Sequence, residues 1–307
     1  MERLKECRLC PRNCACDRMG GKTGYCGETA KIRIARAALH FWEEPFISGT
    51  KGSGAIFFSG CHLKCVFCQN TEIALSRHGM EVSVARLAQI MLSLQAEGAH
   101  NINLVTPSHV VTAVKQALIR AKEKGLRIPV VYNSSGYELA GTLRELEGLV
   151  DIYLPDFKYA DSELAASYSN APDYLPVARE AIAEMFRQTG PFVHDADGML
   201  QCGVVVRHLV LPLGVRNAIK VADEIYDTYG DAVYLSVMNQ YTPIRTIPEY
   251  QQLNRRVTKR EYEKVLNHIM ERGMKNVLFQ EGETASESFI PAFDLTCPAP
   301  RDGMLSE

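Results

Sequence analysis

The sequence predicts an α/β fold: a partial (β/α)6 barrel of about six parallel strands, preceded by a short N-terminal cysteine-rich module. At 307 residues, the chain is long enough for one barrel domain and a small appendage. Beyond residue 70, short apolar runs alternate with segments whose apolar residues recur at helical spacing, which indicates a parallel sheet with helices outside. Polar residues follow the apolar runs, and parallel barrels build their sites at the carboxyl ends of their strands.

The individual elements follow from these two periodicities. Strands are expected at 55–58, 101–105, 128–132, 151–154, 203–211, 233–237 and 276–279. Helices are expected at 82–95, where Ser83 is a plausible cap, and at 110–124, 139–149, 172–188, 218–229 and 259–272, with a polar loop around 195–198. We expect three parts: a cysteine-rich module and lead-in at 1–48, the barrel at 49–285 and an irregular tail at 286–307.

Charge and hydropathy argue against two classes of partner. The formal net charge is −2, which gives no electrostatic case for binding nucleic acid or a membrane surface. The N-terminus is charged and has no apolar signal core, and no apolar run approaches the roughly 20 residues that span a bilayer. Eight of the ten cysteines lie before residue 70 in metal-ligand spacings, which is typical of a protein in the reducing cytoplasm.

Three cysteines form the most specific pattern in the chain. Cys61, Cys65 and Cys68 stand in a C-x3-C-x2-C spacing directly after the apolar run at 55–58, and Gly60 permits a sharp entry into the loop. A zinc site normally recruits a fourth protein ligand, and His78 stands alone. Three thiolates around an iron–sulfur cubane leave one iron free to hold a substrate or cofactor. Backbone N–H groups of such a loop can point at the sulfurs. Structural zinc or a chance cluster is the alternative.

A second group of cysteines lies at the N-terminus. Cys7, Cys10, Cys14 and Cys26 are the expected ligand set, and glycines and Pro11 let the loop fold back so that Cys26 closes the site. Cys16 is a spare thiol or substitute ligand. Zinc with four thiolates and an auxiliary iron–sulfur cluster are both acceptable here, as is a purely structural metal clip. The sequence leaves the metal open.

With these residues in view, the chain resembles the pyruvate formate-lyase activating enzymes and, more closely, an uncharacterised branch of radical S-adenosylmethionine (SAM) proteins related to them. The branch resemblance covers nearly the full length. It rests on the Cys-x2-Cys-Pro-Arg-x-Cys start, the loop from Gly60 to Asn70 with Phe67 before its third cysteine, and the stretches 103–107 and 207–212. The family generates a 5′-deoxyadenosyl radical by reductive cleavage of SAM on a [4Fe–4S] cluster. The resemblance therefore implies a radical SAM oxidoreductase of the glycyl-radical-enzyme-activating type.

The resemblance also implies roles for particular residues. Cys61, Cys65 and Cys68 would hold three irons, while the amino and carboxylate groups of SAM chelate the fourth. Phe67 would lie near the adenine, and Arg207 near the SAM ribose and carboxylate. Asp156 and Lys158 would form an Asp-x-Lys pair beside the SAM carboxylate and a monovalent cation. Asn239 or Tyr241 would fill the position at the sixth strand end. Flavodoxin or ferredoxin would supply the electron.

This sequence departs from the family at two strand ends. The Gly-Gly-Glu that meets the SAM amino group is replaced by Thr106-Pro107-Ser108. The Asp-Thr-Asn-Gly stretch of the activating enzymes becomes Asn133-Ser134-Ser135-Gly136. Thr106, Asn133 and Ser134 therefore stand as cofactor-binding candidates by position. Both departures remove carboxylates that the family uses.

Each charged candidate has a structural alternative. Asp156 and Lys158 point to the same side of a strand and can form a buried salt bridge. Arg207 is a costly buried charge unless it meets an anion, which SAM or a barrel aspartate could supply. His208 faces the other way and is expected in the core. His62 and His109 could move a proton, with only their position in support, and Cys202 is expected to be inert.

Three functions are compatible with this pattern. The first is hydrogen abstraction from a protein, such as the glycine of a glycyl-radical enzyme. The second is radical modification of a small molecule or peptide. The third, from a different class, is an iron–sulfur electron-transfer or scaffold protein without turnover. The third is disfavoured because Asp156, Lys158 and Arg207 still surround the expected SAM position.

Overall fold

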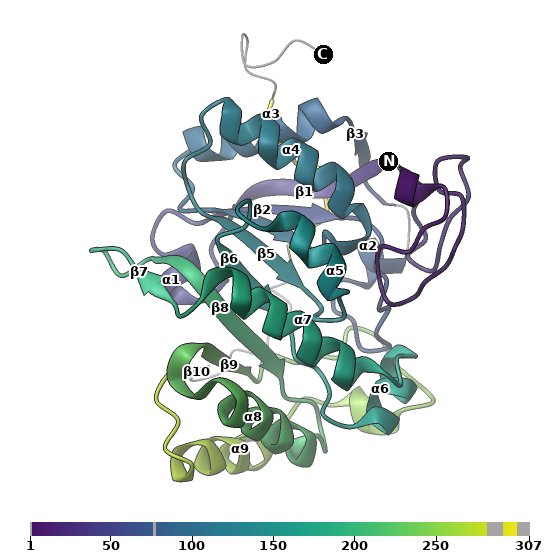
Figure 1. The fold of residues 1–307 in the computed structure, drawn as a ribbon. Coiled ribbons are helices and arrows are strands. Elements are labelled where there is room, and N and C mark those ends of the chain that lie inside the picture. Colours follow the sequence, from purple (N-terminus) through teal and green to yellow (C-terminus); the bar gives the residue numbers. More distant parts are fainter. Residues whose placement is uncertain (1, 76–77, 281–290, 300–307) are drawn as a thin grey trace.

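A computed structural model of the chain describes residues 2–75, 78–280 and 291–299. Its described strands form one curved sheet with the order β10-β9-β8-β6-β5-β4-β2-β1-β3, and β7 pairs with β8 beside this path. Figure 1 shows the helices α3, α4, α5, α7, α8 and α9 packed along one side of this sheet. The predicted α/β class and parallel barrel are confirmed.

The parallel part of the sheet matches the predicted strands closely. Each neighbouring pair along the order β2-β4-β5-β6-β8-β9-β10 is parallel. Their bounds are Ser53–Phe58 for β2, Ile102–Val105 for β4, Val130–Ser134 for β5, Ile152–Pro155 for β6, Leu200–Leu209 for β8, Tyr234–Met238 for β9 and Val277–Phe279 for β10. All seven expected strand runs thus lie in the parallel part, which has one strand more than a (β/α)6 barrel.

Three antiparallel strands were not predicted. β1 (Ile32–His40) pairs with β2 and with β3 (Met80–Val82), while β7 (Val193–His194) pairs with β8 inside the expected polar loop. The lead-in therefore contributes a strand to the sheet. Part of the expected tail runs along the same strand, since Leu295 donates to the Ala35 carbonyl at 3.1 Å. The rest of the tail, at 286–290 and 300–307, lies outside the described residues.

The helices confirm the predicted periodicity, except at 139–149 and at three short helices that were not predicted. Ser83 caps α3 by accepting from the Arg86 N–H at 3.1 Å, as predicted. The expected helix at 139–149 is only a four-residue turn, α5, followed by a 3-10 turn, and the unpredicted α1, α2 and α6 are all short. The bounds are Pro45–Ser48 for α1, Thr71–Leu75 for α2, Val84–Ala96 for α3, Val111–Glu123 for α4, Ala140–Leu143 for α5, Ser162–Ser169 for α6, Tyr174–Thr189 for α7, Val215–Tyr229 for α8 and Lys259–Glu271 for α9.

The inner face of the sheet changes from apolar to polar along each strand. Val131, Leu154 and Val205 belong to an apolar cluster that also holds Ile47 from α1. Side chains of a strand alternate between its two faces, so the residues two positions further on share the inner face with them. Those residues are Asn133, Asp156 and Arg207, at or just beyond the carboxyl ends of β5, β6 and β8. The fold therefore places polar groups directly above an apolar plug.

The described helices include none that is both long and apolar enough to cross a membrane.

Candidate functional site

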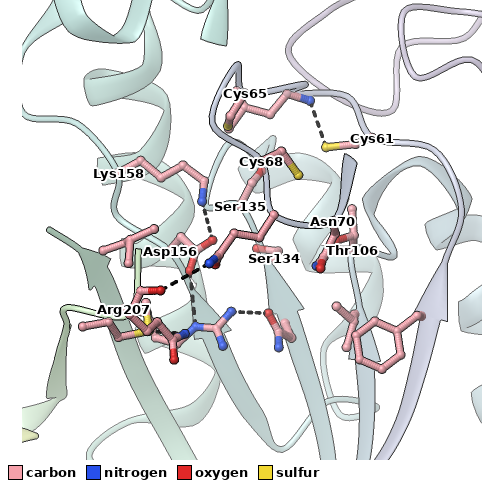
Figure 2. Close-up of a pocket in the computed structure, with 18 of the residues that line it drawn as sticks. Cys61, Cys65, Cys68, Asn70, Thr106, Ser134, Ser135, Asp156, Lys158 and Arg207 are labelled. Atoms are coloured by element: carbon pink, nitrogen blue, oxygen red, sulfur yellow. Dashed lines mark hydrogen bonds and ion pairs between the residues drawn. The ribbon is translucent and has the colours of Figure 1, made fainter. Parts of the chain in front are cut away.

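A cavity of about 240 Å³ opens at the carboxyl ends of the parallel strands. The cluster loop forms one side of it, and the ends of β4, β5, β6, β8 and β9 form much of the rest together with His40, Trp42 and Glu43 at and after the end of β1. Figure 2 shows the three cysteines gathered on one side of the drawn site and Asp156, Lys158 and Arg207 on another. Of the predicted site residues, the cavity is lined by Cys61, Cys65, Cys68, Phe67, Thr106, Asn133, Ser134, Asp156, Lys158 and Arg207.

The backbone of the cluster loop is held tightly around its sulfurs. Gly60 has a φ of +84°, and a Cβ there would lie 2.6 Å from Glu28 Cγ, so this turn requires glycine. The Leu63 N–H donates to Cys61 Sγ at 3.4 Å, as the sequence predicted for this loop. The Ser169 hydroxyl donates to Cys65 Sγ at 3.1 Å. Both sulfurs thus accept a hydrogen bond from the protein.

The electrostatics of the three thiols favour a bound cation. Burial raises the pKa of Cys61, and it raises the pKa of Cys68 to about 12, with the neighbouring cysteines adding to both shifts. Thiols this close resist ionising together, because each thiolate repels the next. A metal centre reverses this, because it binds thiolates and deprotonates them. The donor set therefore fits an iron–sulfur cluster.

A four-residue network of charges faces the cysteines. Arg207 lies at its centre: Nη1 is 3.1 Å from Glu43 Oε2, Nε is 3.2 Å from Asp156 Oδ1, and Nη2 donates to Asn133 Oδ1 at 2.5 Å. Asp156 also accepts from Lys158 Nζ at 2.6 Å. The predicted alternative of a protein carboxylate opposite Arg207 is therefore present. Two carboxylates balance two cations, so the network is close to neutral.

The pKa shifts of Asp156, Lys158 and Arg207 favour the charged forms of these three groups. Burial by itself raises the pKa of Asp156, but Lys158 and Arg207 more than offset it and the pKa is lowered. Burial likewise opposes the charge of Lys158, yet Asp156 and Cys65 raise its pKa to about 12. Cys65 and Cys68 both contribute to that shift, so the Lys158 ammonium lies near the sulfurs as well as near Asp156. It links the charge network to the cluster loop.

Glu43 is the site residue that sequence reasoning missed. It follows β1 and lines the cavity, and Asn103 Nδ2 donates to its Oε1 at 2.9 Å. Its neighbour Glu44 is buried, and burial raises the pKa of that carboxyl. The signal was weak because Glu43 belongs to the antiparallel edge rather than to a parallel strand end.

The comparisons with known proteins agree with this geometry. The sequence pattern described as the Radical SAM superfamily matches residues 55–196. An uncharacterised protein of Methanocaldococcus jannaschii is 30% identical over 275 residues, which cover 86% of this chain and 74% of that protein. This chain belongs to the radical SAM superfamily.

Two solved structures share the radical SAM fold with it. SuiB of Streptococcus suis, in a crystal structure with bound S-adenosylmethionine, has a TM-score of 0.51 at 17% identity over 72% of this chain. The chain spans about half of SuiB, 48% of its length. A radical SAM methyltransferase of Sphaerobacter thermophilus also has a TM-score of 0.51 at 17% identity, covering 76% of this chain and 69% of that one. At this identity the likeness concerns the fold alone.

A radical SAM domain implies a [4Fe–4S] cluster and SAM as cofactors, and the chain is a radical SAM enzyme in this general sense. The matched segment contains the cluster loop, Thr106, Asp156 and Lys158, whereas Arg207, Glu43 and the N-terminal cysteines lie outside it. In the described residues, no three His, Cys, Asp or Glu side chains converge as ligands of one ion do. The thiolates of a cubane bind different irons, so they need not converge on one point.

The strand ends that depart from the family have unusual backbone. Thr106 has a φ of 60°, a left-handed conformation that is strained for a β-branched residue. Its N–H donates to the Asn133 carbonyl at 2.8 Å, which joins the two departing stretches. Gly136 has a φ of +73°, and a Cβ there would lie 2.1 Å from the Asp156 carbonyl. These two positions bring the ends of β4, β5 and β6 together.

Two other predicted residues lie differently from expectation. Asn239 is not among the residues that line the cavity, whereas its neighbours Met238 and Gln240 are. The Asn239 N–H donates to Gln280 Oε1 at 3.0 Å. The Phe67 ring packs edge-on against Tyr159, Tyr168 and Tyr241, so its ring serves the core while its backbone borders the cavity.

The histidines near the loop are structural. His62 is buried, its Nε2 lies 2.8 Å from the Tyr137 carbonyl, and burial lowers its pKa to about 4. His109 is buried with Nε2 2.7 Å from the Ser59 carbonyl, and burial lowers its pKa to about 3. His208 is buried in the core as predicted, bonded to the Phe157 carbonyl. Neutral imidazoles held against carbonyls act as donors rather than as bases.

Proposed function

We propose that the protein cleaves SAM reductively in this cavity and uses the product to abstract hydrogen from a substrate. Cys61, Cys65 and Cys68 would hold the cluster. The observation that supports this most is that the three thiols line the same cavity as a neutral but highly polar network of Asp156, Lys158, Arg207 and Glu43. The bound cluster and SAM would supply the radical chemistry.

The chain's own residues would bind and orient SAM. The amino acid part of SAM carries both charges, so it needs an acceptor for its ammonium and a donor for its carboxylate. Asp156 and Glu43 offer carboxylate oxygens, while Lys158 and Arg207 offer N–H donors, all within one hydrogen-bonded group. We assign Asp156 and Lys158 the roles closest to the reacting atoms, because Lys158 lies beside Cys65 and Cys68.

The polar strand ends would complete the SAM site. Thr106, Asn133 and Ser134 line the cavity where the activating enzymes carry carboxylates. Arg207 orients Asn133, because its Nη2 donates a hydrogen bond to Asn133 Oδ1. At the sixth strand end, the cavity wall favours Gln240 over Asn239. The apolar cluster that holds Val131, Leu154 and Val205 adjoins this polar layer along the same strands.

The class of substrate is a finer proposal. The resemblance to pyruvate formate-lyase activating enzymes supports a glycine of a glycyl-radical enzyme. Radical modification of a small molecule or peptide is the second candidate, and the altered 106–108 and 133–136 stretches favour it because they replace residues of the activating enzymes. In either case flavodoxin or ferredoxin would be the reductant.

One assay tests the proposal. Protein reconstituted anaerobically with iron and sulfide is mixed with dithionite and SAM, and 5′-deoxyadenosine and methionine are measured. We expect both products from the wild type, none from Cys65→Ala, and wild-type amounts from Cys202→Ser, whose thiol lies away from the cavity. A well-formed cluster without cleavage would contradict the proposal. Deuterium transfer from labelled candidate substrates into deoxyadenosine then separates protein, peptide and small-molecule substrates.

A further inference from the structure

The N-terminal module folds its cysteines back onto one another. The Cys7 N–H donates to the Cys16 carbonyl at 3.0 Å, and the Ala15 N–H donates to the Cys7 carbonyl at 2.9 Å. Asn13 and Ala15 adopt left-handed φ values of 44° and 50°, which turn the chain sharply between successive cysteines. All of the cysteines in the chain are free thiols. These turns bring the backbone of Cys7 next to that of Cys16 without a disulfide.

Two thiols of the module lie beside the same glycine. A Cβ on Gly24 would lie 3.1 Å from Cys14 Sγ and 3.4 Å from Cys16 Sγ, so both sulfurs flank this glycine. The Tyr25 N–H donates to Cys14 Sγ at 3.2 Å. The side chains of Cys7, Cys10 and Cys26 are buried, and Cys26 Sγ lies 4.0 Å from the Glu28 carbonyl oxygen.

A buried arginine lies against this group of sulfurs. Arg18 is only 1% exposed, and its Nη1 lies 3.6 Å from Cys7 Sγ. Its other hydrogen bonds go to the carbonyls of Glu28, Thr29 and His109, and within the described residues none goes to a carboxylate. A buried guanidinium without an anion is costly. Thiolates bound to a metal would supply the missing negative charge.

The module also holds the cluster loop. Arg12, between Cys10 and Cys14, donates to the carbonyls of His62 at 2.7 Å and Ser169 at 2.7 Å. Ser169 in turn donates to Cys65 Sγ, so one side chain of the module contacts the loop directly at His62 and reaches Cys65 through Ser169. The Arg12 guanidinium also lies 4.1 Å from the centre of the Tyr25 ring. The position of Arg12 therefore depends on the fold of the cysteine run that contains it.

We propose that Cys7, Cys10, Cys14 and Cys26 bind a second metal centre of thiolate-ligating chemistry, zinc or an iron–sulfur cluster, with Arg18 as its buried countercharge. Cys16 is the adjacent unliganded thiol. Through Arg12, occupancy of this centre fixes the carbonyl of His62, next to Cys61, and the carbonyl of Ser169, whose hydroxyl donates to Cys65. The module is thus a metal-dependent brace for the SAM-cleaving site.

Metal analysis of a chain without the first site tests this. The Cys61→Ala/Cys65→Ala/Cys68→Ala variant is purified anaerobically and its zinc, iron and sulfide are measured, with circular dichroism and thermal unfolding to establish folding. We expect either about one zinc per chain or iron with matching sulfide, which distinguishes the two metals. A folded variant with only traces of both would overturn the proposal. The assay uses no SAM, so its failure is distinct from failure of the proposed activity.

A second set of variants applies if that triple variant does not fold. In the otherwise wild-type chain, Cys14→Ser is expected to lose the equivalent of one centre, while Cys16→Ser and Cys202→Ser lose none. Arg18→Met is expected to weaken metal retention during dialysis against a chelator. Arg12→Lys is expected to keep the module's metal but to retain less iron at the first site. Equal metal content in Cys14→Ser and Cys202→Ser would refute the site.

Discussion

The chain carries two groups of cysteines that differ in what surrounds them. The thiols of Cys61, Cys65 and Cys68 face a cavity shared with four charged side chains, whereas Cys7, Cys10 and Cys26 are buried against Arg18 and backbone. The first group therefore has room for a small molecule beside its metal. The second is closed by the protein itself. The difference indicates chemistry at the first and support at the second.

The largest expected difference between the two regions is in activity. Cys68→Ala removes a thiolate of the cluster loop, so SAM cleavage is expected to fall to the uncatalysed background. Cys14→Ser leaves that loop intact, and we expect only partial loss, because the loop loses a brace rather than a ligand. Deoxyadenosine formation per bound iron measures both. Complete loss in both variants, with iron retained in Cys14→Ser, would show that the module takes part in the chemistry.

The next largest expected effect is on the free energy of unfolding, through the charge network. Arg207→Ala leaves the largely buried Glu43 without its cation and Asp156 with Lys158 alone, which is expected to cost about 3 kcal/mol in the free energy of unfolding. The matched control is Arg179→Ala, whose ion pair with Glu224 is on the surface and is expected to contribute less than about 1 kcal/mol. Chemical denaturation of both variants measures the difference. Equal losses would contradict a buried, mutually dependent network.

Glu138 gives a pH dependence of stability. Burial raises the pKa of its carboxyl from 4.5 to about 8, and it shares a hydrogen bond with Ser108. Between these values the folded protein keeps a proton that the unfolded chain releases, so stability falls as pH rises, by up to about 1.4 kcal/mol per pH unit. Glu138→Gln is expected to flatten this slope and to be the more stable protein at pH 8. An unchanged slope in thermal unfolding across pH 5 to 8 would refute this assignment.

The smallest effect concerns backbone strain at the cavity. Thr106 holds a left-handed φ that costs a β-branched residue roughly 1–2 kcal/mol. Thr106→Gly relieves this strain at some cost in unfolded-chain entropy, so a net gain of about 0.5–1 kcal/mol is expected. Val105→Ala, next to it in β4, is the control and is expected to destabilise. Loss of stability in Thr106→Gly would mean that the Thr106 side chain contributes contacts that outweigh the strain.

The sequence was most informative where the signal is local. Spacing alone located Cys61, Cys65 and Cys68, and strand periodicity placed Asp156 and Arg207 at the same end of the sheet. Glu43 escaped because it follows an antiparallel strand that the helix–strand alternation does not reveal. The sequence placed Asn239 at the cavity, whereas the structure places Gln240 there. The strand β9 is shifted by one residue from its expected bounds, and adjacent side chains point to opposite faces.

The contacts between distant segments were beyond sequence reasoning. The sequence assigned no role to Arg12 or Arg18, because their contacts with residues 62, 109 and 169 depend on how the module docks. The pairing of Arg207 with a protein carboxylate was foreseen as an alternative. The pairing of Arg207 with a second carboxylate was not foreseen, because it depends on Glu43, which follows the unpredicted strand β1.

The most direct test of the account is electron paramagnetic resonance of the dithionite-reduced protein with and without SAM. We predict that SAM changes the spectrum of the cluster at Cys61, Cys65 and Cys68 in the wild type and in Cys14→Ser. We predict no SAM effect in the Cys61→Ala/Cys65→Ala/Cys68→Ala variant, whatever metal its module holds. A SAM-dependent change in that triple variant, or none in a wild type with a full cluster, would contradict the assignment of SAM binding to the cavity.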